Sequence, residues 1–237
     1  MARALGAGLL IFLTVLVLRA PAGLIRMLVP ADAGIDLLDV SGTLWQGSGQ
    51  VLVAGVAVGR IGWSFLPGRL LNGELGYHLS LTGDDLALQG RLHAGMTETG
   101  GSAGGQVDAA FANRWLAAYD IRLSGTFTLE DITFTVRRQK LTALSGAVRW
   151  NGGPVAYRLS GKLHEATLPP LRGDLGPGPF AVVYPAAEST PLLHVRLQED
   201  GFLKIGVTRY LTRLVGDPWP GGDPDHAVVL EVEEQVF

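Results

Sequence analysis

Residues 100–104, Gly100-Gly101-Ser102-Ala103-Gly104, have the G-x-S-x-G spacing of a nucleophile elbow. In that motif the serine lies on a sharp turn between a hydrophobic strand and a helix, which exposes its hydroxyl for attack on a carbonyl carbon. Here the five residues lie in a glycine-rich stretch, from Thr97 to Gly105, and no hydrophobic strand comes before it. The pattern therefore favours a loop, and we predict that Ser102 is not catalytic.

Histidines and aspartates are the remaining side chains that could bind a metal ion or act as acid and base. The histidines lack the i,i+4 spacing that puts two metal ligands on one helix face; they are His78, His93, His164, His194 and His226. His164 and His194 fall on polar positions of predicted strands, which favours solvated side chains. Three aspartates are close in sequence, but prolines and glycines surround them as in a solvated turn; they are Asp217, Asp223 and Asp225.

Other kinds of site are excluded by residues that the chain lacks. Gly161-Lys162-Leu163 has neither the upstream glycine nor the hydroxyl residue of a phosphate-binding loop. The chain has no cysteine, which excludes disulfides, thiol catalysis and cysteine-based zinc sites. Its net charge of -3 and pI of about 5.9 indicate no basic surface for nucleic acid. We therefore predict a protein that is not an enzyme, has no cofactor or metal site, and binds no nucleic acid.

The N-terminal segment has the composition of a membrane helix. Residues 4–18 are uncharged and almost wholly apolar, although a helix that spans a bilayer needs roughly 20 such residues. Arg19 can extend its charge to the interface, which lets the helix continue further. The alternative is a signal peptide, with Arg3 before the apolar run and Ala20-Pro21-Ala22 as the cleavage site. We predict a retained anchor with its juxtamembrane segment over residues 1–30, and both alternatives export the rest of the chain.

The rest of the chain alternates between apolar and polar residues. A content of 47% hydrophobic and 17% charged residues excludes general disorder. Alternation with a period of two recurs in segments 126–137, 157–164, 193–198, 203–208 and 228–233. This is the pattern of antiparallel strands that bury one face and expose the other. We predict an all-β fold, in which the N-terminal membrane helix is followed by a long, twisted, mainly antiparallel sheet, with a curled open sheet and a closed barrel as alternatives.

Short helices and one connection interrupt the strands. Residues 111–119 and 209–215 show helical spacing, and Gly216 ends the second helix. Residues 97–105 are rich in glycine, and residues 169–179 hold four prolines and three glycines, so both stretches are expected to be loops. The predicted organisation is an anchor segment at 1–30, a main antiparallel β body at 31–168, a Pro/Gly-rich connection at 169–180, and C-terminal strands with a short helix at 181–237 that pack on the same body.

A tryptophan-containing motif opens the body. It reads Val40-Ser41-Gly42-Thr43-Leu44-Trp45-Gln46-Gly47, and Ile61-Gly62-Trp63-Ser64-Phe65-Leu66-Pro67 and Leu70-Leu71-Asn72-Gly73 follow it. A central element reads Leu144-Ser145-Gly146-Ala147-Val148-Arg149-Trp150. We expect Trp45 to be largely buried in a strand, on the inner face of the sheet or at its edge, and core or edge positions for Trp63 and Trp150 are favoured over sugar or lipid binding.

Together with the apolar segment before them, these elements resemble the general secretion pathway protein N family (GspN) of type II secretion. The resemblance extends over most of residues 35–237 and includes the segment 198–216. It implies structural roles for Ser41, Gly42, Thr43, Leu44, Trp45, Gly47, Trp63, Pro67, Gly73, Gly146 and Trp150. The short anchor and the proline-rich segment 169–179 depart from the family pattern.

The resemblance implies a single-pass inner-membrane protein whose bulk lies in the periplasm and works with other type II secretion proteins. It implies no enzymatic activity and no cofactor. The chain is also distantly similar to AsmA-like envelope proteins, so the alternative function is a β-groove that binds lipid or lipoprotein. Residues 51–58 are apolar on both strand faces, which fits either burial between layers or such a groove.

Overall fold

The structure is a computed structural model that describes residues 19–28, 34–138, 140–159, 161–176, 180–198 and 201–235. The apolar run at residues 4–18, predicted to be the membrane anchor, lies outside the described residues. In the part of the chain that is described, no helix combines the length and the hydrophobicity needed to cross a membrane.

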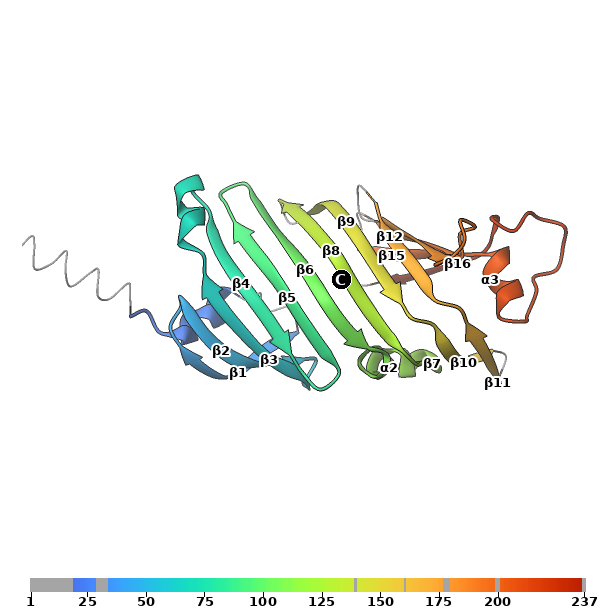
Figure 1. The fold of residues 1–237 in the computed structure, drawn as a ribbon, viewed down its shortest axis with the longest axis horizontal. Helices are drawn as coiled ribbons and strands as arrows, with labels where there is room; N and C mark the ends of the chain where they lie inside the picture. The colour runs from blue at the N-terminus through green and yellow to red at the C-terminus, as the bar shows by residue number, and fades with distance from the viewer. Residues whose placement is uncertain are drawn as a thin grey trace, which may run out of the picture. The chain divides into compact units, whose positions relative to one another are not determined.

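The described residues form mainly strands (Figure 1). The strands are β1 (Ile35–Gly42), β2 (Gln46–Val53), β3 (Val56–Phe65), β4 (Leu75–Thr82), β5 (Leu86–Ala94), β6 (Glu98–Asp108), β7 (Ile121–Leu123), β8 (Thr126–Arg137), β9 (Lys140–Trp150), β10 (Gly153–Leu159), β11 (Lys162–Leu168), β12 (Leu171–Leu175), β13 (Phe180–Pro185), β14 (Leu193–Leu197), β15 (Phe202–Thr208) and β16 (Val228–Gln235). The helices are the 3-10 helices η1 (Ala22–Leu28), η2 (Pro67–Asn72) and η3 (Ala117–Tyr119) and the α-helices α2 (Ala109–Leu116) and α3 (Arg209–Leu214).

Two sheets account for all of these strands. In the larger one, 13 strands are hydrogen-bonded in the order β1-β2-β3-β4-β5-β6-β8-β9-β12-β13-β14-β15-β16. The smaller sheet has the order β11-β10-β7. Most neighbours are consecutive in the chain, as expected for antiparallel strands joined by hairpins. The prediction of a mainly antiparallel β fold is confirmed, and the large sheet is open.

The chain divides into two compact units. Unit 1 comprises residues up to Asp84 together with Arg91–His93, and unit 2 comprises Asp85–Gly90 and Ala94–Phe237. In unit 1, strands β2 and β3 bury Val51, Val58 and Trp63. In unit 2, a core forms around Trp150, Val155 and Leu168, against which Leu123, Phe127, Tyr157, Leu171, Leu214 and Val215 pack.

Two stretches expected to be loops contain strands. The expectation of a loop at 97–105 is wrong, because Glu98–Asp108 forms β6 and pairs with β8. Small residues allow this strand to pack closely against its neighbours, and Gly100 and Gly101 are buried. Within the predicted connection 169–180, Leu171–Leu175 forms β12, which pairs with both β9 and β13. Pro169 and Pro170 come before β12 and remove no ladder hydrogen bond from it.

Strand β8 contains a bulge at Glu130-Asp131 and continues on both sides of it. Asp131 has a φ of 48°, and the register between β8 and β9 shifts from Glu130 to Thr133. Opposite the bulge, Gly146 has a φ of 122°, and a Cβ there would lie 2.7 Å from the Cα of Ile132. A glycine in the central motif therefore allows the bulge to form.

The two predicted helices are present with small changes in their bounds. Asp108 caps α2 by accepting a hydrogen bond from the Ala110 N–H at 2.8 Å, and the helix continues into η3 at Ala117. Helix α3 occupies Arg209–Leu214 and ends before Gly216, whose φ is 83°.

Candidate functional site

The N-terminal motif forms a tight turn that is closed over a tryptophan. The Thr43 N–H donates to the Gln46 carbonyl at 2.8 Å, and the Gln46 N–H donates to the Thr43 hydroxyl at 3.2 Å. The Trp63 indole N–H donates to the Thr43 carbonyl at 3.1 Å. A Cβ at Gly47 would lie 2.5 Å from the Trp63 ring, so only glycine allows this close approach.

The expectation that Trp45 is buried in a strand is wrong. Trp45 lies in a bend before β2 and is only partly buried, with its ring edge-on to Phe65 at 4.7 Å between centroids. The buried tryptophan of the motif is Trp63, which is 4% exposed. The remaining motif residues shape the end of this hairpin: Pro67 starts η2, and Gly73 ends it with a left-handed φ of 71°.

The central motif places a second buried tryptophan. Trp150 is 5% exposed, and its indole N–H donates to the Ser124 carbonyl at 2.8 Å. Its ring stacks with that of Phe127, with 6.1 Å between centroids. Trp63 and Trp150 thus each donate to the backbone of a segment that precedes them in the chain, at Thr43 and Ser124 respectively.

Strand register in unit 2 assembles an apolar face that continues across the sheet from β8 to β16. Directly paired residues of antiparallel strands share a face. One cross-strand row consists of Phe127, Trp150, Leu171 and Pro185. The next consists of Leu129, Val148, Gly173, Val183, Leu193, Val207 and Leu230, and the third of Gly146, Leu175, Ala181, Val195, Ile205 and Val232.

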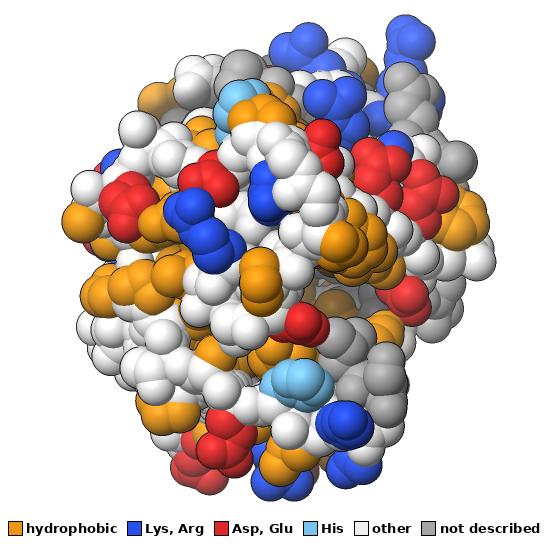
Figure 2. Space-filling view, turned by 90° about the vertical axis from the view of Figure 1, so that its right-hand side faces the viewer, with side chains coloured by type: hydrophobic (Ala, Val, Ile, Leu, Met, Phe, Trp, Pro, Cys, Tyr) orange, Lys and Arg blue, Asp and Glu red, His pale blue; other side chains and the backbone are white. Residues whose placement is uncertain are grey.

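A cavity of about 310 Å³ lies on this face. Leu123 of β7, Leu168 of β11 and Leu211 of α3 cover the part of the face that holds Trp150. Away from this cover, the face becomes exposed at β16, where Leu230 and Val232 are 43% and 45% exposed. Figure 2 views the molecule from the right-hand end of Figure 1 and shows hydrophobic side chains interspersed with charged ones. We name the three rows and their cavity the apolar groove.

The opposite face of the same strands is charged. Arg149 pairs with Glu130 at 2.7 Å, and Lys204 pairs with Glu231 at 2.8 Å. The carboxylate of Glu231 raises the pKa of Lys204. Such exposed pairs add little stability, but they show that this face is charged and wet, in contrast to the apolar side chains of the groove.

Two tyrosine hydroxyls of unit 2 differ in their surroundings. The Tyr119 hydroxyl of η3 donates to the Glu234 carboxylate of β16 at 3.0 Å, and this bond raises the pKa of Tyr119. Beside the core, burial raises the pKa of Tyr157, and the Asp217 carboxylate raises it further. The Tyr157 hydroxyl is buried and has no hydrogen-bond partner among the described residues.

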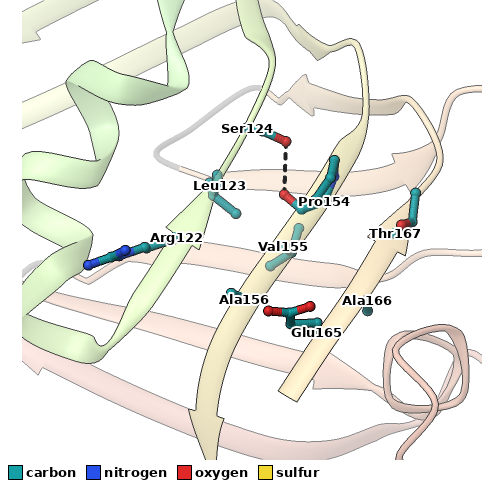
Figure 3. A pocket seen from close by; sticks show the side chains of 9 residues that line it. All are labelled: Arg122, Leu123, Ser124, Pro154, Val155, Ala156, Glu165, Ala166 and Thr167. Carbon is teal, nitrogen blue, oxygen red and sulfur yellow. Dashed lines mark hydrogen bonds between the residues drawn. The ribbon is translucent and has the colours of Figure 1, made fainter. Parts of the chain in front are cut away.

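A second cavity, of about 580 Å³, lies on the small sheet (Figure 3). Ala156 of β10 is in register with Arg122 on one side and with Glu165 on the other. The Ser124 hydroxyl donates to the Pro154 carbonyl at 2.9 Å, and Figure 3 shows this bond beside β10. The lining is mixed in charge and small in side chains, so it is chemically unlike the apolar groove.

The structure keeps the candidates for chemistry apart. Ser102 lies inside β6 opposite Thr133, and His194 lies opposite Gly206 in β15. His164 stacks on Tyr157, and Asp225 pairs with Arg213 at 2.8 Å. Across the described ranges, no three histidine or acidic side chains are placed to hold a metal ion. The apolar groove was not predicted from the sequence: the alternating segments of β8, β14, β15 and β16 were recognised, but β12 was expected to be part of a loop.

Comparison with known proteins assigns the chain to a family. The model of "Type II secretion system (T2SS), protein N" matches residues 33–202, well over half of the chain. The chain belongs to the type II secretion system protein N family. The resemblance stated from the motifs is therefore confirmed, and the match covers the motif turn, both buried tryptophans and most of the apolar groove.

One relative in this family is the type II secretion system protein N of Vibrio cholerae serotype O1. It is 37% identical over 79 residues, which are 32% of this chain and 31% of the relative. The aligned stretch thus spans about a third of the relative's length. No solved structure matches the chain.

Proposed function

We propose that this chain is a non-catalytic, single-pass component of the bacterial inner membrane whose β body lies in the periplasm and scaffolds or helps assemble the type II secretion apparatus. Family membership supports a role in type II secretion. The motif residues act structurally in this proposal, because they close a turn and bury two tryptophans. Other type II secretion proteins are then the partners of the body.

The observation that carries the scaffolding role is the open edge at β16. This strand ends the order of the large sheet, is eight residues long and contains no proline or glycine. At the other end of that order, the backbone of β1 is bulged at Asp39, whose φ is 48°, and bulges blunt an edge. The outer edge of β16 is therefore the better place for a partner strand to add by main-chain hydrogen bonds.

A secretion assay tests this proposal. Single alanine changes at Ser102, the five histidines and Asp217, Asp223 and Asp225 should leave exported enzyme levels near those of the wild type. Replacing residues 1–30 by a cleavable signal should lower secretion, because a short tether raises the effective concentration near membrane partners to the order of millimolar. Immunoblots control for the amount of protein. One point change that abolishes secretion at normal abundance would refute a non-catalytic scaffold.

The apolar groove favours a second function, the binding of an acyl chain of lipid or lipoprotein. The side chains that line its 310 Å³ cavity offer no polar atom to a ligand, and the volume falls within the range of ligand sites. A hydrocarbon chain is the kind of ligand that such a cavity favours, because binding removes apolar surface of both from water. The exposed leucine and valine of β16 would continue the contact with a longer chain.

Filling the cavity should weaken this binding. Gly173 lines the cavity, and a Cβ there would meet other atoms only at 3.7 Å or more, so the Cβ of Gly173→Leu fits without a clash. Each displaced methylene of an acyl chain is worth about 0.8 kcal/mol, so affinity for a fluorescent phospholipid should fall at least fivefold. Gly222→Leu, at an open position, is the matched control. Equal affinities for both variants and the wild type would reject the groove as the binding site.

A further inference from the structure

The hairpin between β3 and β4 carries exposed leucines on an ordered tip. Leu71 is 90% exposed and Leu70 is 52% exposed. The tip is held by a hydrogen bond from the Leu66 N–H to the Gly76 carbonyl at 2.8 Å and by the Arg69–Glu74 ion pair at 2.8 Å. Figure 1 shows η2 beyond the ends of both strands. The leucines are therefore displayed by a fixed backbone, and we name residues 66–76 the leucine tip.

The chain enters unit 1 at the same end of the sheet. The Leu44 N–H donates to the Ala20 carbonyl at 2.8 Å, and Pro21 forms a β-bridge with Thr43. One strand further, the Phe65 N–H donates to the Trp45 carbonyl at 2.7 Å. Phe65 comes directly before the leucine tip, so the tip and Ala20 lie at one end of β2 and β3. Ala20 follows the apolar run 4–18 after a single residue.

We propose that the leucine tip inserts into the surface of the same lipid bilayer that receives the apolar run, as a second membrane contact of unit 1. This inference rests on the membrane anchoring in the proposed function. An apolar run that enters a bilayer brings the membrane surface to the end of the sheet where Ala20 is fixed. Exposed leucines at that end leave water when they enter the interface.

The surroundings of the tip suit a membrane interface. Trp45, Phe65 and Tyr77 form a chain of edge-on ring contacts behind it, with 4.7 Å and 5.6 Å between centroids. Tryptophan and tyrosine are enriched at the level of lipid headgroups. The Arg69 charge is neutralised by Glu74. Insertion of the tip should therefore depend on burial of the leucine side chains and not on attraction to anionic lipid headgroups.

The absence of cysteine from the chain gives a direct test. Leu71→Cys and Val56→Cys each introduce a single thiol. Val56 is the matched control, because it is 45% exposed and lies at the opposite end of β3. The full chain, labelled with an environment-sensitive fluorophore, is reconstituted in phosphatidylcholine vesicles that carry nitroxide-labelled acyl chains. The label at Leu71 should be quenched at least threefold more strongly than the label at Val56.

Flotation of the same vesicles separates the two proposals. A chain that floats with the vesicles and shows equal quenching at both positions would overturn the leucine tip and leave the anchor intact. A chain that does not float would overturn both the anchoring and the tip. Efficient disulfide-linked dimers through Leu71→Cys, with no quenching by lipid, would assign the tip to a second copy of the chain and overturn the bilayer contact.

Discussion

Replacing Trp150 by alanine should lower the free energy of unfolding by about 3–5 kcal/mol, the range for a buried tryptophan. The side chain is 5% exposed and forms the centre of the unit 2 core with Val155 and Leu168. Its removal would enlarge a cavity that already holds about 310 Å³. It would also leave the Ser124 carbonyl without the indole donor. Urea unfolding of the purified chain in mild detergent measures the change.

Two variants separate packing from hydrogen bonding at this position. Trp150→Phe keeps an aromatic ring but removes the indole donor. Because most of the packing is retained, its loss in the free energy of unfolding should be smaller than that of Trp150→Ala. Trp219→Ala removes a tryptophan that is 40% exposed in the same unit, so it should change stability little. A loss for Trp150→Ala no larger than that for Trp219→Ala would contradict the packing of the unit 2 core.

Replacing Trp63 by alanine should cost about 3–5 kcal/mol in unit 1. Trp63 is 4% exposed, packs against Gly47 and donates to the Thr43 carbonyl. Trp45 is only partly buried, so Trp45→Ala is the natural comparison and should cost clearly less. Urea unfolding, followed by the fluorescence of the remaining tryptophans, reports both variants.

A substitution at Gly47 tests the contact between this residue and the Trp63 ring from the glycine side. Gly47→Ala places a Cβ against both the Ser41 carbonyl oxygen and the Trp63 ring, and it should cost about 1–3 kcal/mol by overpacking. Gly68→Ala is its control, because a Cβ at Gly68 meets nothing within 4 Å. If Trp45→Ala proves the more destabilising tryptophan change, the assignment of Trp63 as the buried residue of the motif is wrong.

Several elements could be predicted from the sequence because interactions between residues close in the chain decide them. Alternation of apolar and polar residues placed the strands at 126–137, 193–198, 203–208 and 228–233 correctly, since side chains of a strand alternate between faces. Helical spacing with a glycine stop placed α3 within one residue. The N-terminal tryptophan motif and the central G-x-x-x-W element were also recognisable, and they led to the family.

Pairing between strands could not be predicted from the same patterns. The glycines of β6 look like a loop in isolation, but pairing along β8 makes them a strand. Which tryptophan of the motif is buried depends on the neighbour of Gly47, and that neighbour comes from β3. These outcomes depend on contacts between residues that are far apart in the sequence.

The period-two strands, the apolar N-terminal run and the motif tryptophans could be recognised before the fold was known, because each of these depends on neighbouring residues alone. Only the tertiary structure decided that valines and leucines of seven strands line up in cross-strand rows. It also decided that Ala20 and the leucine tip share one end of a sheet. The physical reason is register: a shift of one residue turns every side chain of a strand to the other face, and register is set by the partner strand.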